Sequence, residues 1–126
     1  MDNEGFSTCG VRMIRIYHNP RCSTSRKALE TLQATGRLVE VVEYLHELPP
    51  RAELRDMIRA AGLSVRDALR PKEPAYESLG LADTALTDEQ LLDAVEQHPV
   101  LLNRPFVVTD KGTRLCRPFE RIQEIL

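Results

Sequence analysis

Two strand-like segments separated by one helix constrain the fold of this chain most. Residues 13–17 (MIRIY) and residues 38–44 (LVEVVEY) have the apolar and β-branched character of strands. Between them the spacing of apolar residues predicts a helix from about 23 to 35, with Gly36 as its stop. One helix between two strands favours a β-α-β unit, in which the strands are parallel and the crossover is right-handed.

A block of helix signals and then a hairpin follow this unit. Helical patterns lie between about residues 50 and 98: one helix starts after Pro50, residues 74–86 read as irregular, and another helix starts after Thr87. Thr87 with Gln90 three positions later is typical of a capping box. Residues 105–109 (PFVVT) and 113–117 (TRLCR) then flank the turn sequence DKG. Two β-like runs around a short glycine-containing turn indicate an antiparallel hairpin.

The order of these elements predicts the fold class. It reads β-α-β, helical block, β-β-α, with Pro118 at the start of the last helix. An antiparallel hairpin joined to a parallel β-α-β unit requires a mixed sheet and disfavours a doubly wound parallel sheet. We therefore predict an α/β, thioredoxin-like fold with a helical insertion at about 50–98. Residues 13–126 are expected to form a single domain, after a flexible N-terminal extension at residues 1–12.

Composition excludes several classes of function. The chain has 126 residues and a net charge of −2, which gives no electrostatic argument for binding nucleic acid or an anionic membrane. It has neither a membrane-spanning apolar run nor a secretory signal pattern, so we expect a cytoplasmic protein. We separately expect it to be a monomer. The three cysteines, Cys9, Cys22 and Cys116, show no C-x-x-C motif and no zinc-ligand spacing. Free thiols and no bound metal are therefore expected.

Cys22 lies at the expected junction of the first strand and the first helix. The free N–H groups and the dipole of a helix N-terminus stabilise an anion, so a thiolate there has a lowered pKa. The hydroxyls of Ser23, Thr24 and Ser25 add donors for the thiolate or for an oxyanion beside it. The alternative is a buried structural cysteine, but the polar loop after Pro20 favours a reactive thiol.

Further candidates lie before and after Cys22 in the sequence. His18 either stabilises the thiolate as imidazolium or accepts its proton; the alternative is an exposed histidine at a strand end. Arg104 and Arg117 each precede a proline at a predicted strand end, where guanidinium groups can bind an oxyanion. From residue types alone, both arginines are equally compatible with solvated surface positions. Pro105, which opens a strand, is a candidate for a cis peptide bond.

Three motifs carry a resemblance to a known family. The segments YHNPRCSTSR, LLNRPFVVT and GTRLCRP resemble the glutaredoxin-coupled arsenate reductase family, and the resemblance extends over residues 13–126. It implies a catalytic Cys22 and a histidine, His18, that lowers the pKa of this cysteine. It also implies a cis bond at Pro105, and it matches three arginines to oxyanion-binding positions: Arg70 in the further motif DALRPKEP, Arg104 and Arg117.

The resemblance also implies a reaction. The Cys22 thiolate attacks arsenate, glutathione as co-substrate attacks the adduct, and arsenite forms together with a mixed disulfide that glutaredoxin resolves. No bound cofactor is needed, and Ser25 can replace the second cysteine of a redox pair because the second thiol comes from outside.

Three alternatives to this reaction stay open. The first is a glutathione-dependent thiol oxidoreductase of the same family with a different substrate. The second is a redox-responsive transcription regulator that binds RNA polymerase, which the missing second cysteine disfavours. The third is an anion-binding module in which Cys22 has no role.

Overall fold

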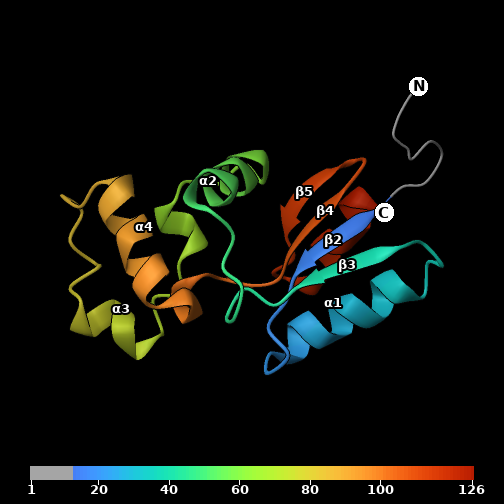
Figure 1. Ribbon diagram of the computed structural model, residues 1–126, viewed down its shortest axis with the longest axis horizontal. Helices are drawn as coiled ribbons and strands as arrows, with labels where there is room; N and C mark the ends of the chain where they lie inside the picture. The colour runs from blue at the N-terminus through green and yellow to red at the C-terminus, as the bar shows by residue number, and fades with distance from the viewer. Residues whose placement is uncertain (1–12) are drawn as a thin grey trace. The chain divides into compact units, whose positions relative to one another are not determined.

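The computed structural model describes residues 13–126, which divide into two compact units (Figure 1). The sheet unit comprises the described residues up to Glu43 together with Arg104–Leu126, and the helical unit comprises Tyr44–Asn103. The predicted extension at residues 1–12, with Cys9, lies outside the described residues. The assignment of 13–126 to a single domain with an insertion at 50–98 stays a prediction.

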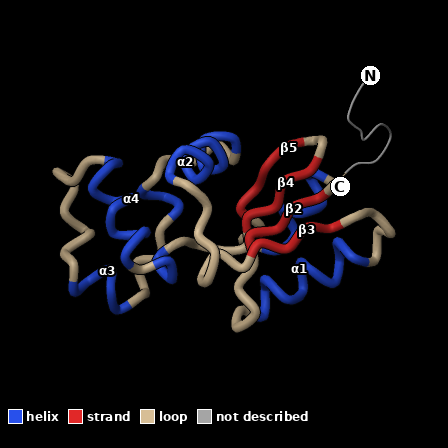
Figure 2. The backbone as a smooth tube through the Cα atoms, viewed as in Figure 1, coloured by secondary structure: helices blue, strands red, loops and turns tan. Residues whose placement is uncertain are grey.

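The sheet unit contains a four-stranded mixed sheet, whose strands are red in Figure 2. The strand order is β3 (Val39–Val42), β2 (Ile14–Tyr17), β4 (Phe106–Thr109) and β5 (Gly112–Leu115). β2 and β3 are parallel, whereas β4 is antiparallel to both β2 and β5. The predicted β-α-β unit and the terminal hairpin are therefore confirmed, and so is the mixed sheet that joins them.

The core of this unit lies between the sheet and two helical segments, α1 (Ser23–Gln33) and η3 (Phe119–Ile125). β2 and β3 are linked by α1, as predicted, and η3 is the predicted closing helix. η3 is a 3₁₀-helix, the tighter form that occurs in short segments. The buried side chains of the core come from the strands and both helical segments: Ile14, Ile16, Ala28, Leu32, Val107, Cys116, Ile122 and Ile125.

A two-residue turn closes the hairpin between β4 and β5. Thr109 pairs with Gly112, so Asp110 and Lys111 form the turn. Gly112 has a φ of 147°, a backbone conformation that glycine adopts more readily than other residues. The hydroxyl of Thr109 donates to the carbonyl of Ile125 over 2.7 Å, which ties the turn to the end of η3.

The helical unit contains α2 (Arg51–Ala60), α3 (Pro74–Ser78) and α4 (Asp88–Gln97), with two short 3₁₀ segments, η1 (Arg66–Ala68) and η2 (Pro99–Leu101). The helices predicted after Pro50 and after Thr87 are confirmed. The prediction that residues 74–86 are wholly irregular is wrong, because Pro74 starts the short helix α3 at its first position.

Polar contacts fix the start of α4 and connect this helix to α2. The Thr87 hydroxyl accepts from the Gln90 N–H over 3.2 Å, and the Gln90 side chain accepts from the Thr87 N–H over 2.8 Å. The predicted capping box is therefore confirmed. Arg51 of α2 forms ion pairs with three carboxylates of α4, at 2.5 to 3.0 Å: Glu89, Asp93 and Glu96.

No helix in residues 13–126 is long and apolar enough to cross a membrane.

Candidate thiol site

Cys22 is the N-cap residue of α1, as the sequence predicts. Its N–H donates to the carbonyl of Asn19 over 3.0 Å, and its own carbonyl accepts from the N–H of Arg26 over 2.9 Å. The first bond closes the turn that leads out of β2, and the second starts the helix. Only 7% of the Cys22 surface is exposed. The thiol is therefore both at a helix N-terminus and largely buried.

Three groups near the Cys22 sulfur favour its charged form. They are the backbone N–H of Ser25 and the side chains of Arg104 and Arg117. Nη1 of Arg117 lies 3.6 Å from the sulfur and 3.2 Å from the carbonyl oxygen of Arg104. The structure thus brings Cys22 together with two of the three arginines predicted from the motifs.

These contacts change the acidity of the thiol. Burial raises the pKa of Cys22, but the N–H of Ser25 and the guanidinium groups of Arg104 and Arg117 lower it by more. The net result is a pKa below the usual 9.0. A larger fraction of Cys22 is therefore thiolate at neutral pH than for an ordinary cysteine, which makes it a better nucleophile.

His18 lies near the thiol but contacts Ser25. The imidazole is 5% exposed, and its Nδ1 is 2.6 Å from the Ser25 hydroxyl oxygen. Burial lowers the pKa of His18 below 6.5, and Arg26 lowers it further, whereas Glu43 raises it. The alternative of an exposed histidine at a strand end is wrong. Of the two predicted forms, the neutral imidazole is favoured at neutral pH, and the catalytic role of His18 stays a prediction.

The three hydroxyls after Cys22 differ in their surroundings. Ser23 is exposed, Thr24 is half-buried and Ser25 is fully buried. The Ser25 hydroxyl contacts His18 and also accepts from the N–H of Asn19 over 3.1 Å. The sequence predicts a hydroxyl donor for the thiolate or an oxyanion, whereas in the structure the Ser25 hydroxyl contacts His18 and Asn19, and it is the Ser25 N–H that lowers the pKa of Cys22.

Both arginines of the site precede cis-prolines. The Arg104–Pro105 peptide bond is cis, as predicted, and the Arg117–Pro118 bond is cis as well. The Cys116 N–H donates to the carbonyl of Pro105 over 2.9 Å, which extends the pairing of β4 with β5. Arg104 and Arg117 therefore sit at neighbouring strand ends, as the hairpin pattern predicts.

Arg70 lies in the helical unit, and its described contacts are within that unit. Its guanidinium forms an ion pair with Glu73, three residues later. Both side chains are about four-fifths buried, with 22% and 18% of their surfaces exposed. Its role as an oxyanion ligand stays a prediction from the motif. The ion pair with Glu73 was not predicted, although opposite charges three residues apart are a signal for such a pair.

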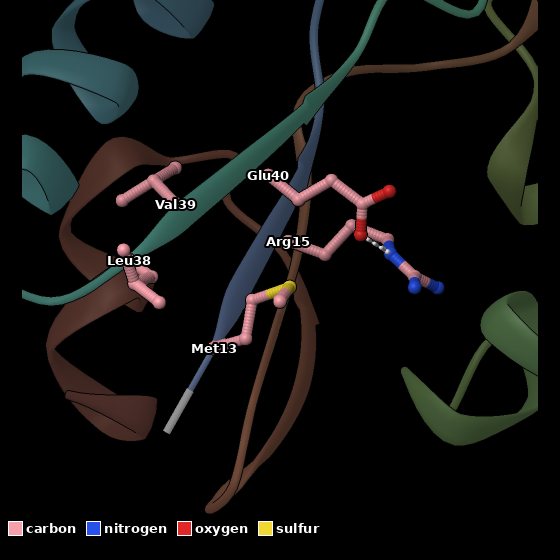
Figure 3. Close-up of a pocket in the computed structure, with 5 residues that line it drawn as sticks. All are labelled: Met13, Arg15, Leu38, Val39 and Glu40. Atoms are coloured by element: carbon pink, nitrogen blue, oxygen red, sulfur yellow. Dashed lines mark hydrogen bonds and ion pairs between the residues drawn. The ribbon is translucent and has the colours of Figure 1, made fainter. Parts of the chain in front are cut away.

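Two other features do not form part of this site. Cys116 is fully buried, and burial raises the pKa of its thiol to about 12. A shallow groove of about 440 Å³ lies at the edge of the sheet, beside β3 (Figure 3). Its lining includes the ion pair of Arg15 with Glu40 but no predicted site residue.

No group of three metal-binding side chains occurs among residues 13–126.

Comparison with known proteins gives the family. The ArsC family matches residues 17–125. An arsenate reductase of Rhizobium meliloti is 54% identical over 113 residues, covering 90% of this chain and 81% of the relative. An arsenate reductase of Escherichia coli is 50% identical over 113 residues, covering 90% of this chain and 80% of the relative. The solved arsenate reductase of Vibrio cholerae superposes with a TM-score of 0.86 and 40% identity, over 92% of this chain and 99% of that one.

The agreement with this solved structure and with the family match confirms the predicted thioredoxin-like fold class. The chain therefore belongs to the ArsC family.

Proposed function

We propose that this protein is an arsenate reductase that forms a covalent adduct between Cys22 and arsenate and is reduced by glutathione and glutaredoxin. Arsenate reduction is supported by the relatives of that name at 54% and 50% identity. The observation that carries the mechanism is the Cys22 sulfur at a helix N-terminus, with hydrogen bonds from Arg104 and Arg117.

The proposed reaction has three steps. The Cys22 thiolate attacks arsenic, a sulfur–arsenic bond forms, and a protonated oxygen leaves as water. The thiol of glutathione then attacks the Cys22 sulfur, and the electron pair of the sulfur–arsenic bond stays on arsenic. Arsenic thereby goes from the five-valent to the three-valent state, and a Cys22–glutathione disulfide remains. A glutaredoxin thiol takes the glutathione and releases the Cys22 thiolate.

The guanidinium groups explain why this site suits an oxyanion. Arg104 and Arg117 provide fixed positive charge beside the sulfur, where the negative charge of both thiolate and arsenate gathers. We propose Arg70 as a third ligand from its motif, and it would exchange its contact with Glu73 for one with the oxyanion. Glutathione is a co-substrate in this scheme, and the site requires no resident cofactor. A cytoplasmic location and a monomeric state belong to the same proposal.

A coupled assay tests the proposal. The purified protein is expected to reduce arsenate only when both glutathione and glutaredoxin are present. Cys22→Ser is expected to abolish turnover, because an alcohol is far less acidic and does not form the mixed disulfide. Cys116→Ala removes the other described thiol and is the matched control, which is expected to keep turnover. Arsenate turnover by the Cys22→Ser variant would contradict the mechanism.

Arg104→Ala refines the test, because Arg104 contacts the thiol. The variant is expected to raise the KM for arsenate and also to slow alkylation of Cys22 by iodoacetamide. If alkylation slows and the KM does not change, Arg104 acts on the thiol alone.

A second candidate function is a glutathione-dependent thiol oxidoreductase with a different substrate. The lowered pKa of Cys22 favours it equally, because a nucleophilic thiol does not select arsenate. Fast alkylation of Cys22 together with no arsenate turnover would support this candidate.

A further inference from the structure

Ser25 connects the histidine and the thiol of the site. It is fully buried, and its hydroxyl oxygen lies 2.6 Å from Nδ1 of His18 and 3.1 Å from the N–H of Asn19. Its own backbone N–H lies in the first turn of α1 and lowers the pKa of Cys22, and the Cys22 N–H donates to the carbonyl of Asn19 over 3.0 Å. We call His18, Asn19, Cys22 and Ser25 the Ser25 cluster. Ser25, in the first helical turn, thus contacts both His18 and Asn19 of the loop that joins β2 to α1.

The Ser25 oxygen has two hydrogen-bond contacts within residues 13–126. The Asn19 N–H can only donate, so the Ser25 oxygen accepts from it. The other contact is Nδ1 of His18, which can accept the hydroxyl proton. A hydroxyl that donates to Nδ1 leaves the proton of a neutral imidazole on Nε2. Because His18 is buried, the neutral form is the one that the site favours.

We propose that Ser25 is a positioning residue, whose hydroxyl donates to Nδ1 of His18, accepts from the N–H of Asn19 and thereby holds the first turn of α1 in place around Cys22. The inference rests on the proposed function only in taking Cys22 as the reacting thiol. It assigns the hydroxyl a role within the protein, away from the substrate. It also gives His18 an indirect role, since its described side-chain hydrogen bond goes to Ser25.

The charges around the cluster allow this effect to be separated from others. Arg104 and Arg117 act on Cys22, whereas Glu43 and Arg26 act on His18. All four charges remain when Ser25 is replaced by alanine, and the hydroxyl itself carries no charge. A change in the acidity of Cys22 in Ser25→Ala therefore reports the loss of geometry.

The test measures the rate of Cys22 alkylation by iodoacetamide against pH, together with the nitrogen NMR signals of His18. Ser25→Ala is expected to move the midpoint of the alkylation profile upward and to slow alkylation near neutral pH by roughly threefold to tenfold. The His18 signals are expected to change as its Nδ1 loses the hydroxyl proton. Ser25→Thr, which keeps the hydroxyl, is expected to restore the wild-type midpoint.

Thr31→Ala is the matched control on the same helix. The Thr31 hydroxyl bonds only to the carbonyl of Lys27 over 3.0 Å, so its removal is expected to leave both measurements unchanged. An unchanged midpoint in Ser25→Ala would overturn the proposal. If that variant does not fold, the NMR signals of His18 in the wild-type protein still test the proposal. A neutral His18 with its proton on Nδ1 would also overturn it. Neither measurement uses arsenate, so a protein that fails to reduce arsenate leaves this test intact.

Discussion

At the scale of single residues, two cysteines show that surroundings decide acidity. Cys22 and Cys116 are both buried, and burial alone raises the pKa of a thiol. One N–H group and two guanidinium groups lower the pKa of Cys22 below 9.0. Cys116 packs among apolar side chains, and its pKa rises to about 12. Of these two thiols, Cys22 therefore has the larger thiolate fraction near neutral pH.

The lowered pKa of Cys22 predicts how stability depends on pH. The folded protein releases the Cys22 proton at a lower pH than the unfolded chain, whose thiol has its usual value of 9.0. The contribution of Cys22 is therefore fully present above pH 9.0 and is lost as the pH falls through the folded pKa. We expect the free energy of unfolding of the wild type, relative to Cys22→Ser, to rise from neutral pH toward 9.0.

Urea unfolding at a series of pH values measures this difference. The raised pKa of Cys116 acts in the opposite direction, since its contribution is present below 9.0 and is lost as the pH rises toward about 12. Cys116 is present in both proteins, so it cancels in the comparison. A difference that stays flat or falls between neutral pH and 9.0 would contradict the prediction.

The sequence predicted the residues of the site better than their bonds. The pattern of the sequence places Cys22 at a helix start and Arg104 and Arg117 at strand ends, but the family resemblance was needed to assign the three to one site, where the structure brings them together. The bond of Ser25 to His18 was not predictable, because it depends on which side of a helical turn is buried. The ion pair of Arg70 with Glu73 depends in the same way on burial of both side chains.

At the scale of elements, the helical unit depends on polar contacts at helix ends and between helices. α2 has three buried apolar residues, and its exposed side joins α4 through Arg51. Exposed ion pairs stabilise a protein little when isolated but more when several share one residue. The capping box of α4 satisfies two N–H groups that the helix itself leaves unpaired.

Thr87→Ala tests the contribution of this cap. The variant is expected to lower the free energy of unfolding by about 1 kcal/mol, because the Gln90 N–H loses its acceptor. Thr84→Ala is the matched control, since Thr84 is an exposed threonine in the turn before α4. Denaturant unfolding followed by circular dichroism measures both. Equal stabilities for the two variants would show that the cap contributes nothing.

Two features of the structure, α3 and the cis bond before Pro118, were not predicted because the sequence carries no local signal for them. α3 spans five residues and buries none of them, so it has no apolar stripe from which to predict a helix. The cis bond before Pro118 has no local signal beyond the proline itself. By contrast, the helices α1, α2 and α4 each have buried residues that repeat with the period of a helix.

At the scale of the molecule, the sheet unit is assembled from two distant parts of the chain. β2 and β3 come from its first third, whereas β4 and β5 come from its last quarter, and β2 pairs with β4. The overall fold class was predictable because an antiparallel hairpin and a parallel β-α-β unit fit together only in a mixed sheet. The thiol of Cys22 belongs to the first of these two parts of the chain, and its guanidinium partners belong to the second.

Labelling of the two described cysteines reports this assembly. In the folded protein a brief treatment with iodoacetamide at neutral pH is expected to label Cys22 and to leave Cys116 unlabelled. In urea both thiols lose their surroundings, so their rates are expected to become nearly equal. Peptide mass spectrometry measures the ratio across the unfolding transition. A ratio that stays constant through unfolding would show that folding does not control the reactivity of either thiol.

The pairing of Arg117 with Cys22 also has a consequence during synthesis of the protein. The two residues are 95 positions apart, so the ribosome adds the cysteine long before the arginine that helps to ionise it. Until the last strands form, the growing chain carries an ordinary thiol with the usual slow reactivity toward oxidants. Cys22 therefore becomes a reactive thiol, open to unwanted oxidation, only after enough of the chain has been synthesised for the last strands to fold.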